Sequence, residues 1–171
     1  VIFSLMLTSL AIGTIITMTS THWLLAWIGL ELNTLSIIPI IIKQHHPRST
    51  EATTKYFLTQ AAASAMLLFA STTNAWHTGT WDISQLSNQP ASIMFTAAIS
   101  MKLGLAPTHF WLPEVLQGTS MATALIITTW QKLAPMSLMF LTQNSLSPTI
   151  LMTLGLLSAL VGGWGGLNQT Q

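Results

Sequence analysis

Long stretches of this chain contain no charged side chain. Residues 1–30 carry none, and neither do residues 133–171. A helix needs roughly 20 predominantly apolar residues to cross the hydrocarbon of a bilayer. Charged residues make up 5% of the chain, against about 25% in an ordinary soluble domain. The sequence therefore predicts an all-α, polytopic membrane protein that forms a single membrane domain over residues 1–171.

The apolar pattern predicts six membrane-spanning segments. They cover approximately residues 1–20, 23–42, 52–71, 91–105, 120–142 and 148–164. A polar stretch from Thr72 to Pro90 is predicted to be a loop. The fourth segment is predicted to be discontinuous near Gly104–Pro107, because a proline removes a backbone donor and clashes with the preceding turn. Pro135 predicts a bend in the fifth.

The ends and the loops suggest the extent of the chain and its orientation. The chain begins at Val1 rather than at methionine, and neither end resembles a native terminus, so we expect a fragment of a longer protein. Lys43 and Arg48 lie in the loop Lys43–Glu51, whereas the other loops contain no lysine or arginine. Positive charge accumulates on the side from which a membrane protein is inserted. We therefore expect this loop to face the bacterial cytoplasm or the mitochondrial matrix.

Three charged residues lie near the middle of predicted spans. Glu31, Lys102 and Lys132 lie about 12, 16 and 18 Å from the starts of their segments, at a rise of about 1.5 Å per residue. The hydrocarbon is about 30 Å thick, so all three approach its midplane. A charge at that depth costs at least ~2.5–3.5 kcal/mol and commonly marks an ion or proton pathway. Their similar depths suggest a line of charges within the membrane.

A structural role or a shallower position would also account for these charges. A buried glutamate and lysine can simply hold helices together, and a misplaced boundary would bring Lys132 nearer the surface. The helix break beside Lys102 favours the functional interpretation, because broken membrane helices occur where protein lines a polar cavity.

Several other polar residues are weaker candidates. His109 follows the break and is a candidate proton relay, although a bond to a carbonyl freed by the break explains it equally well. Glu114 is interpreted as a surface acid rather than a proton donor to the interior. The pair His45–His46 has no carboxylate within four residues, so no metal site is predicted. The chain has no cysteine, which excludes disulfides and iron–sulfur ligation, and no basic run that would bind nucleic acid.

Five motifs carry a family resemblance. They are Trp27–Asn33, Pro47–Glu51 followed by Lys55–Gln60, Met101–Val115, Trp130–Pro135 and Gly162–Gln171. In this order they resemble the second subunit of mitochondrial NADH dehydrogenase (respiratory complex I), an antiporter-like family. The resemblance covers nearly the whole chain. It implies that Glu31 is the family's buried helix glutamate, Lys102 the lysine of its discontinuous helix, and Lys132 the lysine that passes protons along the central axis.

The resemblance also implies a function for the assembly. The chain would be a core membrane-arm subunit of the proton-translocating NADH:ubiquinone oxidoreductase in the mitochondrial inner membrane, with the loop Lys43–Glu51 in the matrix. NADH, FMN, the iron–sulfur clusters and ubiquinone would be bound by other subunits, so no cofactor or metal is expected in this chain. Its partners would be the other subunits and membrane lipids. The family's second half is absent, so the fragment would not pump alone.

Two rival functions share some of these features. A free-standing cation/proton antiporter would use the same buried glutamate and lysine. A structural membrane scaffold would contain inert buried ion pairs, and neutralising Glu31 together with Lys102 would then alter assembly but not transport.

Overall fold

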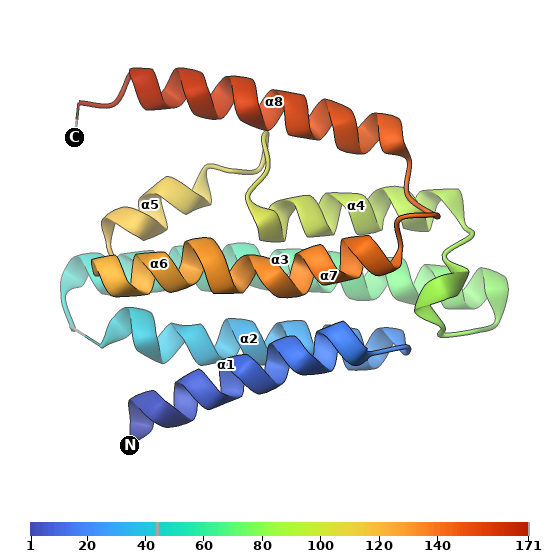
Figure 1. Cartoon of the computed structure of the whole chain (residues 1–171), viewed down its shortest axis with the longest axis horizontal. Coiled ribbons are helices and arrows are strands. Elements are labelled where there is room, and N and C mark those ends of the chain that lie inside the picture. Colours follow the sequence, from blue (N-terminus) through green and yellow to red (C-terminus); the bar gives the residue numbers. More distant parts are fainter. Residues whose placement is uncertain (44, 171) are drawn as a thin grey trace.

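The computed structural model describes residues 1–43 and 45–170, which form an array of helices (Figure 1). Within these residues no strand forms, and one isolated β-bridge pairs His22 with Asp82. The α-helices are α1 (Ile2–Thr19), α2 (Trp23–Ile42), α3 (Pro47–Thr78), α4 (Gln89–Leu103), α5 (Trp111–Gln117), α6 (Met121–Thr129), α7 (Leu133–Leu141) and α8 (Pro148–Leu167). Two 3-10 turns, η1 (Ile83–Gln85) and η2 (Trp130–Lys132), lie between them.

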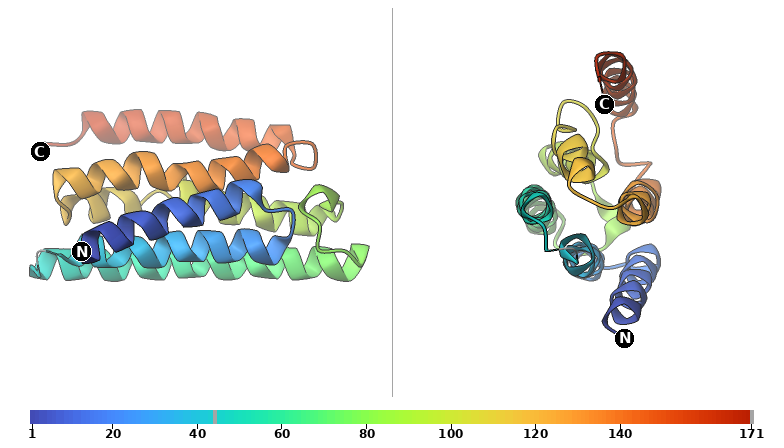
Figure 2. Two further views of the ribbon diagram at one scale, coloured as in Figure 1. Left: turned by 60° about the horizontal axis from the view of Figure 1, so that its bottom comes forward. Right: turned by 90° about the vertical axis from the view of Figure 1, so that its left-hand side faces the viewer.

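The helices lie side by side with their long axes nearly aligned (Figure 2). α2 contacts α1 and α3, α3 contacts α4 and α5, and α7 contacts α1 and α4. One apolar cluster includes Trp23, Leu67 and Phe95, and a second includes Leu10 and Val115.

The predicted all-α polytopic fold is confirmed. Four segments are long and apolar enough to cross a membrane: α1, α2, the stretch Met121–Leu141 and α8. The longer but more polar α3 and the broken pair α4–α5 lie alongside them (Figure 1). This arrangement agrees with six predicted segments, two of which are not continuous α-helices.

The predicted loop from Thr72 to Pro90 is wrong at both ends, because α3 continues to Thr78 and α4 begins at Gln89. The predicted loop Lys43–Glu51 is wrong from Pro47 on, because α3 begins there, and its residue Gln44 lies outside the described residues. The helix ends at Gly79, which adopts a φ of 71° and whose N–H donates to the carbonyl of Ala75 at 2.7 Å. Thr72 and Thr73 do not break the helix, since their hydroxyls donate to the carbonyl of Phe69 within it. The 32 residues of α3 span about 48 Å, which exceeds the roughly 30 Å of hydrocarbon. A helix of this length can therefore carry polar residues at its end beyond the thickness of the hydrocarbon.

The fifth span is interrupted rather than simply bent. α6 ends at Thr129, the turn η2 follows, and α7 starts at Leu133. Pro135 has no N–H to donate to the carbonyl of Gln131, and its ring crowds the same turn. The irregularity therefore lies just before the proline that was predicted to cause it, and it falls on Lys132.

α8 lies at one side of the array (Figures 1 and 2). None of its residues is buried, although Leu151 is partly covered by the first apolar cluster.

Candidate functional site

The break between α4 and α5 creates the polar centre of the molecule. Gly104 ends α4 with a φ of 75°, and the backbone is irregular until α5 begins at Trp111. The predicted discontinuity near Gly104–Pro107 is confirmed. Two carbonyls in the last turn of α4 accept bonds from side chains: the indole N–H of Trp111 donates to Met101 at 3.0 Å, and Lys132 donates to Leu103.

Lys132 reaches the break from η2 on another span. Its Nζ lies 2.6 Å from the carbonyl oxygen of Leu103 and 5.3 Å from the ring centroid of Trp111. A cation is favoured at a helix C-terminus, where the carbonyl dipoles point outward, and over the face of an indole ring. Lys132 thus caps the broken end of α4.

Lys102 lies in the same turn of α4 but has no such partner. Its side chain is 4% exposed, and its Nζ is buried without a hydrogen bond to any described residue. An ammonium group has three donors, and burying an unpaired charge is expensive. Among the lysine and arginine side chains that the structure describes, Lys102 is the one that is buried and has no hydrogen-bond partner for its ammonium group.

Glu31 lies on α2, next to Leu30, which borders a cavity together with Lys102. Its Oε2 is buried and has no hydrogen-bond partner among the described residues. Among the described residues, the ion pairs are those of Lys55 with Glu51 and Glu114. Within the described residues, Glu31 and Lys102 therefore form no direct ion pair.

A small cavity, lined by both polar and apolar side chains, joins the two interior lysines. Its volume is about 10 Å³. Lys102 and Lys132 both border it, and Trp111 borders it beside them. The other lining residues come from α2, α3 and the fifth span: Leu30, Asn33, Thr34, Tyr56, Gln60, Ile127, Gln131 and Pro135. The structure thus brings Lys102 and Lys132 to one space.

His109 lies apart from this cavity, in the irregular segment between α4 and α5. Its Nδ1 is buried and has no partner within the described chain, and its ring centroid is 4.5 Å from that of Phe110. The structure does not give it the bond to a freed carbonyl that was the alternative prediction, and its role as a relay stays a prediction.

Sequence reasoning missed the contribution of α3 to the cavity. Tyr56 and Gln60 are four residues apart and share one face of the helix, and both border the cavity. The signal was present, because polar side chains at this spacing inside an otherwise apolar segment are unusual. It was overlooked because neither residue carries a formal charge.

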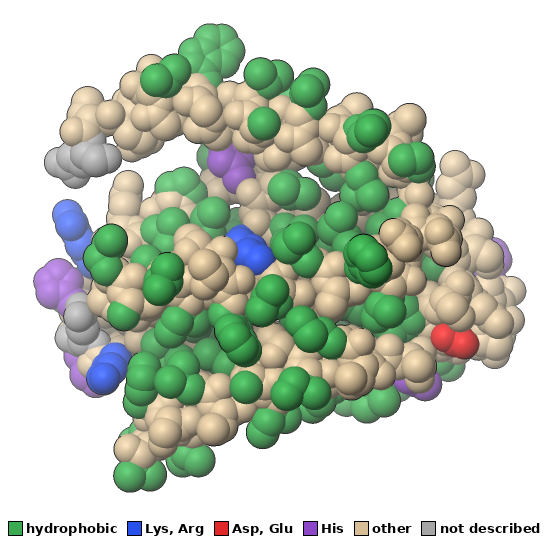
Figure 3. Space-filling model, in the orientation of Figure 1, with side chains coloured by type: hydrophobic (Ala, Val, Ile, Leu, Met, Phe, Trp, Pro, Cys, Tyr) green, Lys and Arg blue, Asp and Glu red, His purple; other side chains and the backbone are tan. Residues whose placement is uncertain are grey.

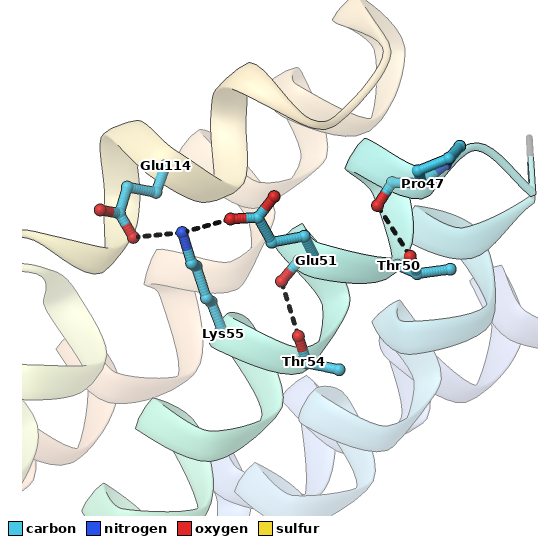
Figure 4. A network of polar contacts seen from close by, with 6 residues as sticks. All are labelled: Pro47, Thr50, Glu51, Thr54, Lys55 and Glu114. Atoms are coloured by element: carbon cyan, nitrogen blue, oxygen red, sulfur yellow. Dashed lines mark hydrogen bonds and ion pairs between the residues drawn. The ribbon is translucent and has the colours of Figure 1, made fainter.

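A second charged cluster lies at one end of the array (Figure 4). Lys55 of α3 bridges two carboxylates, with its Nζ 2.8 Å from Glu51 and 3.0 Å from Glu114 of α5. The hydrogen bond from Lys55, and secondarily its charge, holds the pKa of the Glu51 carboxyl below its usual value. These residues border an open cleft together with Arg48, Ala52, Gln117 and Gly118. The cluster thus ties α3 to α5 at the surface.

The wider surface of the molecule carries little charge. In the face shown in Figure 3, basic side chains gather at the end where α2 passes into α3, and one more lies in the middle. No three histidine, aspartate or glutamate side chains converge to hold a metal ion within residues 1–43 and 45–170.

Comparison with known proteins identifies the family. The family described as NADH:quinone oxidoreductase/Mrp antiporter, TM, matches residues 20–171. The chain belongs to this family. It is 62% identical over 170 residues to NADH-ubiquinone oxidoreductase chain 2 of Oncorhynchus mykiss, covering 99% of this chain and 49% of that protein. It is 62% identical over 166 residues to the protein of the same name from Cyprinus carpio, covering 97% and 48%.

A solved structure agrees with the fold. A chain of respiratory complex I from Thermus thermophilus with bound aureothin superposes with a TM-score of 0.91 and 28% identity. The match covers 98% of the present chain and 40% of that one. The resemblance inferred from the five motifs is confirmed. The chain spans about half the length of the curated relatives it matches.

Proposed function

We propose that this chain is part of a core membrane subunit of a proton-pumping NADH:ubiquinone oxidoreductase, and that it moves protons through Glu31, Lys102 and Lys132. The observation that carries the proposal is the state of Lys102. This lysine is buried and unpaired among the described residues, and it lies beside a broken helix on a cavity that it shares with Lys132. A stably charged lysine serving only packing would need a partner for its ammonium group.

Glu31 acts as the electrostatic partner that controls the proton on Lys102. An opposite charge nearby favours the protonated amine, whereas burial disfavours it. Neutralising or moving Glu31 leaves only the burial effect, so Lys102 then releases its proton. Because no ion pair within the described chain fixes Glu31, a modest change in its distance is enough to alter this balance.

Lys132 receives the proton that Lys102 releases. The carbonyl of Leu103 holds its Nζ at the broken end of α4, on the cavity that Lys102 also borders. A neutral amine keeps donor hydrogens for this bond and gains a lone pair that accepts a proton. His109, which follows the break, is a candidate relay between this centre and the outside.

The remaining parts of the proposal follow from the family resemblance of the sequence. The partners are the other subunits of respiratory complex I and membrane lipids, and NADH, FMN, iron–sulfur clusters and ubiquinone are bound in other subunits. The location is the mitochondrial inner membrane, with the segment Lys43–Glu51, which includes the start of α3, in the matrix. Residues 1–171 form part of a single membrane domain.

The test is to replace Lys102 by methionine in the full-length subunit within the assembled complex. Lys102→Met removes the proton-binding amine and keeps a long apolar side chain. We expect proton transport by proteoliposomes, measured with a pH-sensitive dye, to fall at least tenfold per assembled complex, which is a barrier change of about 1.4 kcal/mol. Lys55→Met is the matched control and should retain transport. Unaltered proton stoichiometry and rate in Lys102→Met would refute the proposal.

The family match also includes antiporters, which makes free-standing cation exchange the second candidate. Sodium-dependent proton exchange by the full-length chain alone in liposomes would favour it. A scaffold role would be favoured if Glu31→Gln combined with Lys102→Met lowered the amount of assembled complex without changing transport per complex.

A further inference from the structure

The open cleft at the end of the helix array, where α3 meets α5, carries charges of both signs. Arg48, Glu51 and Lys55 of α3 border it, and so does Glu114 of α5. The volume of the cleft is about 380 Å³, which is room for roughly ten water molecules at about 30 Å³ each. The cleft therefore has space for a polar group much larger than water, and the charges that line it sum to zero.

The charges that line the cleft are only partly paired with one another. Lys55 contacts one oxygen of each carboxylate, Oε1 of Glu51 and Oε2 of Glu114 (Figure 4). Each carboxylate keeps a second oxygen that can accept hydrogen bonds. Arg48 forms no ion pair among the described residues, and its guanidinium group has five N–H donors. The cleft therefore offers both carboxylate acceptors and a cation to a ligand.

α3 and α5 run antiparallel along the cleft, which gives it an outer and an inner end. Gly118, directly after α5, packs against the start of α3, where an added Cβ would lie 2.7 Å from the carbonyl oxygen of Arg48. Glu114, one turn earlier on α5, contacts Lys55, about two turns later on α3. Because α3 is longer than the hydrocarbon is thick, its first turns can lie at the depth of the lipid headgroups.

Exposed apolar side chains continue from the inner end of the cleft. Leu58 lies three residues after Lys55 on the same face of α3, and it is 66% exposed. Phe110 lies four residues before Glu114 and directly precedes α5, and it is 71% exposed. A molecule with its polar group in the cleft can therefore lay an apolar chain over Leu58 and Phe110. This order of surfaces matches a phospholipid, whose headgroup lies at the membrane surface and whose acyl chains point inward.

We propose that this cleft binds one zwitterionic phospholipid that carries a primary ammonium group, the chemistry of phosphatidylethanolamine. The lipid phosphate lies at Arg48, because a guanidinium group matches phosphate in both charge and geometry. The lipid ammonium lies between Glu51 and Glu114 and donates to the carboxylate oxygens that Lys55 does not contact. The site goes beyond the proposed function, and it requires only that the helices lie in a membrane.

The balance of charges selects this headgroup over the alternatives. With the lipid bound, the two carboxylates face two ammonium groups, those of Lys55 and of the lipid, and Arg48 faces the phosphate. An anionic headgroup would bring a phosphate to Arg48 but would leave the two carboxylates with Lys55 alone. A choline headgroup is zwitterionic but has no N–H to donate, so the carboxylates would gain no hydrogen bond from it. An ethanolamine headgroup supplies both the charge and the donors.

The first test uses the assembled wild-type complex in nanodiscs that contain a photoreactive phospholipid. Phosphatidylethanolamine, phosphatidylcholine and phosphatidylglycerol with the same diazirine-bearing acyl chains are compared, and mass spectrometry locates the labelled peptides. We expect the ethanolamine lipid to label peptides that contain Leu58 or Phe110 about fivefold more than either other lipid, the effect of one exposed charge contact. Equal labelling by all three lipids, stronger labelling by the glycerol lipid, or no labelling of these peptides would overturn the proposal.

The second test removes the charges of the cleft one at a time in the same complex. Glu114→Gln should abolish the preference for ethanolamine over choline, and Arg48→Gln should lower labelling by all three lipids about fivefold. Lys43→Gln is the matched control, because Lys43 is a cation at the same end of the array whose Nζ lies over the ring of Phe3 and not on the cleft. It should label as wild type does.

Two results would contradict the assigned contacts. A full preference for ethanolamine in Glu114→Gln would remove the ammonium site, and equal labelling in Arg48→Gln and Lys43→Gln would remove the phosphate site. If a variant does not assemble, the comparison of the three lipids on the wild-type complex decides the question. Labelling is measured without turnover, so these outcomes are independent of proton transport through Lys102.

Discussion

Lys55 and Lys102 differ in both solvent exposure and ion pairing. Lys55, with a side chain 38% exposed, lies at the end of the helix array and contacts two carboxylates. Lys102 is buried in the interior and contacts none that the structure describes. The lysine that water already solvates is thus the one that is paired with carboxylates, and an exposed ion pair of this kind contributes little to stability. The lysine that has lost its water has no carboxylate partner among the described residues, although a buried charge needs one most. A contribution to stability therefore does not explain why a lysine lies in the interior.

Lys132 is intermediate between these two lysines. It has one hydrogen-bond partner among the described residues, and that partner is the neutral carbonyl of Leu103. A neutral acceptor stabilises an ammonium group less than a carboxylate does, but it also bonds to an amine that has lost its proton. The interior therefore keeps Lys132 in place in either protonation state, whereas the carboxylates around Lys55 favour its charged form.

The largest expected effect comes from comparing the interior glutamate with the edge glutamate. Glu31→Gln removes the charge that acts on Lys102, so we expect proton transport by the assembled complex to fall about tenfold or more, equivalent to at least about 1.4 kcal/mol in barrier. Glu51→Gln removes a carboxylate from the edge cluster and should leave transport unchanged. The measurement is dye-detected acidification of proteoliposomes per assembled complex. Equal losses in both variants would remove the distinction between the two regions.

The next effect concerns the cap that Lys132 places on α4. Lys132→Met loses the bond to Leu103, and a charged hydrogen bond of this kind is worth about 2 kcal/mol. We expect faster hydrogen exchange in residues 104–110, measured by mass spectrometry on the full-length subunit in detergent. Lys132→Arg keeps a cation and should preserve protection in this segment. Unchanged exchange in Lys132→Met would show that the break is held by other contacts, such as the bond between Trp111 and Met101.

The sequence predicted the fold through features that act locally. Apolar stretches defined the spans, and Pro107 and Pro135 indicated where two of them are irregular. The positions of Glu31, Lys102 and Lys132 on separate helices followed from these segments. The end of α3 was misplaced because polarity was interpreted as a loop, although the threonine hydroxyls bond to a carbonyl of the same helix.

The contacts of the site depend on packing that local patterns do not determine. The bond from Lys132 to Leu103 joins residues 29 positions apart, and the ion pair between Lys55 and Glu114 joins α3 to α5. Glu114 was correctly placed at the surface, but its partner was not predicted. Tyr56 and Gln60 carry no formal charge, and their place on the cavity appears only in the folded structure.

A smaller effect is expected where packing, rather than charge, holds the edge cluster together. A Cβ added at Gly118 would lie 2.6 Å from the Cβ of Ala52 and 2.7 Å from the carbonyl oxygen of Arg48. Gly118→Ala therefore pushes α5 away from α3, and we expect a loss of about 1 kcal/mol in stability from overpacking. Gln117→Ala, at the neighbouring position on the same cleft, is the control and should be nearly neutral. Chemical denaturation in detergent measures both, and a neutral Gly118→Ala would mean that the edge tolerates separation.

The smallest effect is the pH dependence of the edge ion pair. The hydrogen bond and charge of Lys55 lower the pKa of Glu51 from its usual 4.5, so the folded state binds this proton more weakly than the unfolded state does. The stabilisation is therefore fully present above pH 4.5 and is lost as the pH falls through the lowered value. Glu51→Gln should unfold at a slightly lower temperature than wild type near pH 7, and the difference should disappear at strongly acidic pH and in molar salt, which screens exposed pairs. A difference that persists unchanged at acidic pH and high salt would show that Glu51 stabilises the edge by packing, and the contrast with Lys102 would then concern burial alone.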